Sequence, residues 1–148
     1  MKLAGGLYCR PRKNAFGVAP PDDRHLVRTF LKSDDFLLTS YNHFNELGLG
    51  LTQIYATHRV YNHRRAGDFT LGGKRFHFRR VPAFPRKLSK AYLLVDLLNN
   101  LKHLPDDTMR VLENLRSRLR EFDAEEVRRC AERFGSPRAR NVLKALRA

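Results

Sequence analysis

Hydrophobic positions along the chain predict a series of short elements. Residues 36–38 form an apolar run typical of a buried strand, and Tyr41, Phe44 and Leu47 follow at helical spacing. Gly48 then ends the pattern, because glycine adopts the left-handed backbone of a helix end at little steric cost. A strand, a short helix and a glycine exit are therefore predicted over residues 36–53, and the rest of the chain is organised around them.

A helix is predicted over about residues 23–33, ahead of this unit. Its apolar face would carry Leu26, Val27, Phe30 and Leu31. Further upstream, Leu7–Arg10 is interpreted as a strand, and the prolines between the two segments favour an extended connection.

A β-hairpin is the clearest local prediction. A strand is expected within 54–61, and 69–71 and 74–81 flank a Gly72-Gly73 pair suited to the positive φ angles of a two-residue turn. In the return strand Phe76 and Phe78 point one way, while Arg75, His77 and Arg79 point the other. One face of the hairpin should be core and the other cationic.

The C-terminal third predicts helices over about 89–103, 107–121, 123–134 and 136–146. The first is apolar nearly all round and should be the buried central helix. The predicted fold is α+β: a small, mostly antiparallel sheet with a basic hairpin packed on helices, followed by a C-terminal helical bundle. Residues 1–88 would form the α+β core, and 89–148 the bundle, packed on it as one unit.

Composition narrows the class of protein. Apolar residues make up 42% of the 148 positions, which is enough for a core and argues against global disorder. No signal peptide and no spanning segment is recognised, and Cys9 and Cys130 form no CxxC motif. We expect a soluble, cytoplasmic protein with no membrane partner and with structural or surface thiols.

The net charge of +14 is concentrated in one segment. Residues 54–90 hold 10 basic and 1 acidic side chains, a pattern that favours a surface for a polyanion such as nucleic acid. Lysine and arginine there can neutralise phosphates, and histidine can stack on bases or bond to them. A solvated, charge-protected sheet edge is the plainer alternative. The candidate nucleic-acid-binding residues are Arg59, Arg64, Arg65, Lys74, Arg75, His77, Arg79, Arg80, Arg86 and Lys87.

The six histidines do not predict a metal site. They are scattered, without an HxxxH or HExxH pair and without a cysteine pair, so no metal and no cofactor is expected. A metal-independent ribonuclease needs no metal ligands, and His58, His63 or His77 could act there as acid and base. That alternative stays open beside a non-enzymatic role.

Arginines in the last two predicted helices could let this helical tail read DNA, as helix–helix segments do, and a protein-interaction module is a third alternative for the function. Arg128, Arg129 and Arg133 lie near Glu125 and Glu132, a pattern typical of a mixed, solvated face. A protein-interaction module that acts through this helical tail would use neither the hairpin nor its histidines.

Three stretches together resemble a known family. They are LAGGLYCRPRKNAFGVAPPD, LLTSYNHFNELGLGLTQ and TLGGKRFHFRRV, which cover most of residues 3–81 in this order. The chain resembles the AbiEi-type antitoxins of type IV toxin–antitoxin, or abortive infection, systems of bacteria. Members of that family carry an N-terminal winged helix that binds the operon's own promoter.

The resemblance implies a function without catalytic residues. It suggests a transcription-regulating antitoxin that opposes a nucleotidyltransferase-type toxin without requiring a stable complex, and it favours DNA over RNA as the nucleic acid. Residues 1–13 would be the remnant of a winged-helix wing, and the rest of the winged helix would be lacking.

Overall fold

A small sheet with one helix, and a separate group of helices, account for the residues that the computed structural model describes, namely 12–14, 17–19 and 22–147. The chain divides into two compact units. The first contains the described residues up to Ser40 together with Tyr55–Arg86, and the second contains Tyr41–Ile54 and the residues from Lys87 onward. The predicted α+β class is confirmed.

The sheet of the first unit has the strand order β3-β4-β6-β5. Its strands are β3 (Phe36–Thr39), β4 (His58–Asn62), β5 (Gly67–Leu71) and β6 (Lys74–Arg80). Two of its three pairings are antiparallel, as predicted, whereas the central pair β4–β6 is parallel. The hairpin causes this arrangement, since β5 occupies the edge and returns the chain through β6 beside β4.

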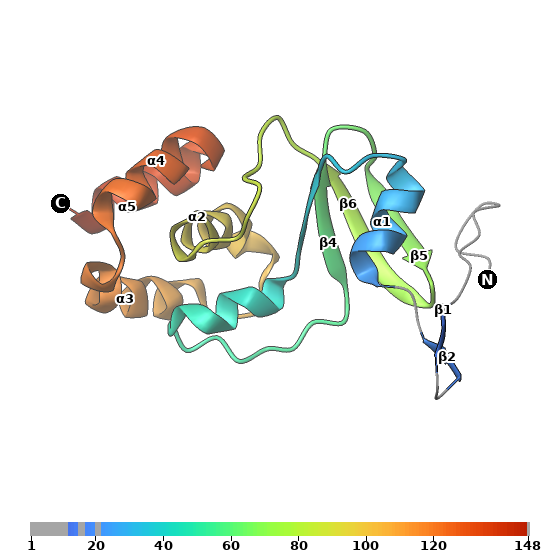
Figure 1. Ribbon diagram of the computed structural model, residues 1–148. Helices are drawn as coiled ribbons and strands as arrows, with labels where there is room; N and C mark the ends of the chain where they lie inside the picture. The colour runs from blue at the N-terminus through green and yellow to red at the C-terminus, as the bar shows by residue number, and fades with distance from the viewer. Residues whose placement is uncertain (1–11, 15–16, 20–21, 148) are drawn as a thin grey trace. The chain divides into compact units, whose positions relative to one another are not determined.

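Helix α1 (Asp23–Leu31) covers one face of this sheet (Figure 1). The ring centroid of Phe30 lies 4.8 Å from that of Phe69 and 5.1 Å from that of Phe78. Phe76 and Phe78 have no exposed surface. Burying two such rings contributes roughly 3–6 kcal/mol, enough to fix which way β6 faces.

The hairpin turn has the predicted geometry. Gly72 and Gly73 have φ angles of 58° and 79°, as a type I′ turn requires at both central residues. The preceding loop is closed by Asn62, whose Oδ1 accepts hydrogen bonds from the N–H groups of Arg64 (2.8 Å) and Arg65 (2.7 Å).

The N-terminal part contributes a two-stranded antiparallel ladder of β1 (Arg12–Asn14) and β2 (Gly17–Ala19), described by its backbone alone. The predicted strand at Leu7–Arg10 lies outside the described residues, as does Cys9. The proposed wing remnant at residues 1–13 lies outside them too, except for the backbone at Arg12 and Lys13.

The second unit is built on the predicted helices. They are α2 (Lys90–Asn100), the 3₁₀ turn η2 (Leu101–His103), α3 (Thr108–Arg118), the 3₁₀ turn η3 (Leu119–Glu121), α4 (Ala124–Phe134) and α5 (Pro137–Arg147). Ser89, Asp107, Asp123 and Ser136 each accept a hydrogen bond from a first-turn N–H. The predicted helix starts are therefore confirmed.

A half-buried amide joins three elements of this unit. The Asn99 side chain donates to the carbonyl of Phe134 (2.9 Å) and accepts from the N–H of Ser136 (2.8 Å). Both backbone groups of the α4–α5 connection are thus satisfied by α2, and the connection is held at a fixed place on that helix.

The short helix predicted at 41–47 exists as the 3₁₀ helix η1 (Tyr41–Leu47), and its buried residues are Tyr41, Phe44 and Leu47. It belongs to the second unit, although the predicted division at residue 88 placed it in the first. Its apolar side packs with α2, where the Tyr41 hydroxyl donates to Asn100 Oδ1 at 2.9 Å. Ile54, expected near the start of a strand, is 81% exposed and lies outside β4.

Replacing Lys32 by glycine should stabilise the protein. Lys32 ends α1 at φ 56° and ψ 38°, the left-handed region that costs an L-residue about 1 kcal/mol, and its side chain is exposed. We expect Lys32→Gly to raise the free energy of unfolding in urea by about that amount. Lys32→Ala, which keeps a Cβ atom, should show no gain, and an equal gain in both variants would contradict the explanation.

Gly135 should not tolerate substitution by alanine, and the reason is steric contact rather than backbone conformation. Its φ is −79°, which any residue adopts, but an added Cβ would lie 2.5 Å from the Ala131 carbonyl oxygen. We expect Gly135→Ala to cost about 2 kcal/mol of unfolding free energy. Gly73→Ala has open space around it and should cost about 1 kcal/mol, through backbone strain alone. The reverse order would show that steric contact does not govern Gly135.

Candidate nucleic-acid interface

Strands β4 and β6 bring four predicted residues together on one face of the sheet. Side chains alternate along β6, so Arg75, His77 and Arg79 point away from the α1 side on which Phe76 and Phe78 are buried. The parallel register sets Arg59 beside His77. We call Arg59, Arg75, His77 and Arg79 the basic face.

An aspartate faces this cluster from the edge strand. Asp68 is the cross-strand partner of His77, and its Oδ1 lies 2.7 Å from His77 Nδ1. It is also the only acidic residue between positions 54 and 90. The carboxylate holds the imidazole in one orientation and offsets part of the positive charge of the basic face.

A polar hollow opens beside the Asp68–His77 pair. Its rim carries Thr57, Asp68, Thr70 and Arg75, and it extends to Phe69 and Phe76, which are paired across β5 and β6. Thr70 and Arg75 are direct cross-strand partners, one step along the ladder from Asp68 and His77 on the same face. We call this feature the Arg75 hollow.

Three other predicted residues engage α1 instead of the basic face. Lys74 Nζ lies 2.6 Å from Asp23 Oδ1, and Arg64 Nη1 donates to the Leu31 carbonyl at 3.1 Å. The guanidinium of Arg65 stacks over Phe30, 4.8 Å from the ring centroid. These three residues therefore tie the two ends of α1 to the sheet and do not contribute to the basic face.

The remaining three predicted residues lie at the end of the unit. Arg80 is exposed and, by strand alternation, shares the side of Phe78. Arg86 is the last residue of the first unit, whereas Lys87 begins the second. Sequence proximity grouped them with the hairpin, but strand alternation places Arg80 on the opposite side of β6 from the basic face, and Arg86 and Lys87 follow the end of that strand.

The three histidines of the ribonuclease hypothesis lie apart. His58 stacks on Phe76, with Nε2 3.8 Å from Asp23 Oδ2, on the α1 side of the sheet. His63, in the loop after β4, contacts the Phe84 ring, and its Nε2 lies 3.8 Å from Asp35 Oδ2. Only His77 belongs to the basic face, so the structure does not bring the three histidines together at one site.

Sulfur and metal chemistry receive little support from the described part of the chain. Within it, no group of three or more histidine, cysteine, aspartate or glutamate side chains is placed to hold a metal ion. Burial raises the pKa of the Cys130 thiol, which makes it a poor nucleophile. No helix in the described part of the chain is long and apolar enough to cross a membrane.

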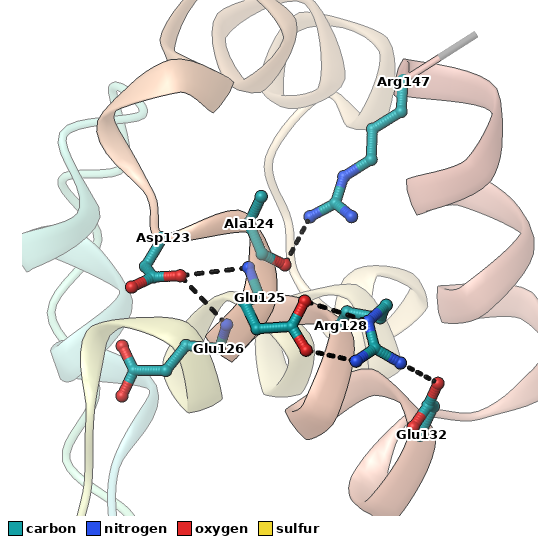
Figure 2. Close-up of polar contacts among 7 residues, drawn as sticks. All are labelled: Asp123, Ala124, Glu125, Glu126, Arg128, Glu132 and Arg147. Carbon is teal, nitrogen blue, oxygen red and sulfur yellow. Dashed lines mark hydrogen bonds and ion pairs between the residues drawn. The ribbon is translucent and has the colours of Figure 1, made fainter.

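The arginines of the helical tail are partly engaged by neighbouring groups, as Figure 2 shows around the start of α4. Arg128 bonds to Glu125 and, at 2.8 Å, to Glu132, while Arg147 Nη2 donates to the Ala124 carbonyl at 3.3 Å. This geometry is that of the mixed, solvated face predicted for the tail. The hydrogen bond and charge of Arg128 hold the pKa of the Glu125 carboxyl below its usual range.

Comparisons with known proteins add no relative. No family model matches the chain, and neither a curated protein nor a solved structure is significantly similar to it. The likeness to AbiEi-type antitoxins thus stays a hypothesis drawn from the quoted sequence stretches.

The Glu125–Arg128 pair should contribute a small, pH-dependent part of stability. Because the native pKa of Glu125 is lowered, its contribution exists above the unfolded carboxyl pKa of about 4.3 and is lost as the pH falls through the native pKa. Glu125→Gln should lower the urea midpoint slightly at neutral pH and leave it unchanged near pH 2.5. For the control Glu113→Gln, at an exposed site on α3, the difference in urea midpoint from the unmodified protein should be the same at neutral pH and near pH 2.5.

Proposed function

We propose that the protein binds nucleic acid through the basic face and acts as a non-enzymatic regulatory protein of the antitoxin type. The observation that carries the proposal is the parallel β4–β6 register. It joins Arg59 to Arg75, His77 and Arg79 on one side of a sheet whose other side is occupied by α1. A rigid strand pair that presents several cations suits a phosphate backbone, which is a regular array of negative charges.

The charge balance of the first unit supports this assignment. Residues 22–40 and 55–86 of this unit contain eleven Lys and Arg against five Asp. Four of those aspartates lie within ion-pair distance of a lysine, an arginine or a histidine: Asp23, Asp34, Asp35 and Asp68. The surplus is therefore cationic, and it favours sequence-independent contact with phosphates and release of counterions.

The geometry favours binding over the two alternatives. Cleavage of RNA without a metal needs an acid and a base placed near one phosphate, and of the three histidines considered for that role only His77 belongs to the basic face. In the helical tail, Arg128 is already shared between two glutamates. Nucleic-acid binding requires neither a second imidazole nor an unengaged tail arginine.

The biological role follows from the sequence resemblance alone. We propose a transcription-regulating antitoxin of a type IV system that acts in the cytoplasm and contacts DNA in preference to RNA. Its functional partner would be a nucleotidyltransferase-type toxin, opposed without a stable complex. A basic sheet face is compatible with that role, because DNA contact and opposition to a toxin require no catalytic residue in this chain.

Charge reversal at one arginine tests the proposed surface. Arg75 is exposed on β6, so Arg75→Glu should fold normally, weaken binding of a mixed-sequence duplex about tenfold and reduce the magnitude of the salt slope by about one. Fluorescence anisotropy over a salt series measures both quantities, and a thermal melt by circular dichroism checks the fold.

The matched control carries the same charge change on the other unit. Arg140 is exposed on α5, and Arg140→Glu should leave the affinity within about twofold of the unmodified protein. Equal weakening by both variants would mean that only net charge matters. Weakening by Arg140→Glu alone would move the interface to the helical tail.

A further inference from the structure

The Arg75 hollow combines donor groups with a single carboxylate. Thr57 and Thr70 supply hydroxyls and Arg75 a guanidinium, all on the side of the sheet away from Phe76 and Phe78. Guanidinium forks and hydroxyl donors are the groups that proteins use to hold phosphate oxygens. The hollow is therefore suited to a single phosphate group.

Asp68 opposes that use on electrostatic grounds. Its side chain is 83% exposed on the rim of the same hollow, and a carboxylate repels a phosphate there. Arg75 on the same rim offsets part of the charge of this carboxylate, and a proton on His77, whose Nδ1 lies 2.7 Å from Asp68 Oδ1, would offset more of it. Binding of an anion in the hollow should therefore depend on the protonation of His77.

The groups around His77 determine the sign of this effect. Asp68 faces it from β5, Arg59 from β4, and Arg75 and Arg79 flank it on β6. Histidine is the side-chain type that can gain or lose a proton near neutral pH, whereas arginine keeps its charge. With a neutral imidazole the pair carries one negative charge, and with a protonated imidazole it carries none.

We infer that the Arg75 hollow is a phosphate site whose occupancy is coupled to the uptake of a proton by His77. The inference deepens the proposed function and rests on it, since the phosphate would belong to the bound nucleic acid. The affinity for phosphate then rises as the pH falls and His77 takes up a proton. A bound phosphate in turn favours the protonated imidazole, because the two effects are reciprocal.

The first test measures a gain of affinity, which loss of folding cannot imitate. Asp68→Asn should raise the affinity for a mixed-sequence oligonucleotide at pH 8, and it should weaken the pH dependence. Asp35→Asn is the matched control, because Asp35 is also exposed, also lies beside a histidine, and belongs to the same unit away from the hollow. Equal gains in the two variants would overturn the inference.

The second test removes the imidazole. The unmodified protein should bind about tenfold more tightly at pH 5.5 than at pH 8 at constant salt. His77→Gln should lose most of that gain, while His63→Gln, at the Asp35 site, should keep it. Full retention of the gain in His77→Gln would overturn the inference and leave the proposed function standing.

A titration with inorganic phosphate tests the Arg75 hollow independently of nucleic-acid binding. Titration with phosphate at millimolar concentration should move the ring resonances of His77 in the NMR spectrum and leave those of His63 unchanged. If phosphate moves them but no oligonucleotide binds, the hollow is a site for free phosphate and the proposed function fails. If neither ligand has an effect, both the inference and the proposed function are wrong.

Discussion

The packing of Phe76 and Phe78 against α1 is the constraint on which the first unit depends. A slip of β6 by one residue would expose both rings and bury Arg75, His77 and Arg79 beneath the helix. Losing two buried aromatic rings would cost roughly 3–6 kcal/mol, and burying guanidinium groups among apolar side chains would add to that cost. The apolar core thus fixes the direction in which the cations point. The basic face is a direct consequence of core formation.

The two units differ in how they manage charge. In the second unit arginine and glutamate alternate along α4, and Arg128 bridges two carboxylates one turn apart on either side. In the first unit the few aspartates pair with particular basic side chains: Asp23 lies within ion-pair distance of Lys74 and His58, and Asp68 lies within ion-pair distance of His77. What remains on the sheet is an excess of positive charge held by regular strands. Under the proposed function, this excess of positive charge would face a polyanion.

Local patterns in the sequence were sufficient for much of this fold. Four predicted features depend on neighbouring residues alone, and all are confirmed: the Gly72-Gly73 turn, the alternation of β6, the helix caps at Ser89 and Asp123, and the core face of α1.

Non-local pairing was not accessible in this way. The parallel register of β4 and β6 and the packing of η1 with α2 join segments far apart in the chain, and hydrophobic periodicity does not encode their partners. For the same reason the sequence grouped Lys74 and Arg64 with the cationic surface, although both contact α1. The Asp68–His77 pair was missed because it depends on the exact hairpin register, although a two-residue turn does set 68 opposite 77 by counting back from it.

The most direct test of the account is the salt dependence of binding by the unmodified protein. A labelled mixed-sequence duplex and the corresponding single strand would be titrated at neutral pH, from low to physiological salt, with anisotropy as the readout. If the three arginines of the basic face each neutralise a phosphate, the logarithm of the association constant should fall linearly with the logarithm of salt concentration, with a slope of about −3 on duplex DNA. Absence of binding at low salt, or an affinity that does not change with salt, would contradict the claim that this face of the sheet is a nucleic-acid surface.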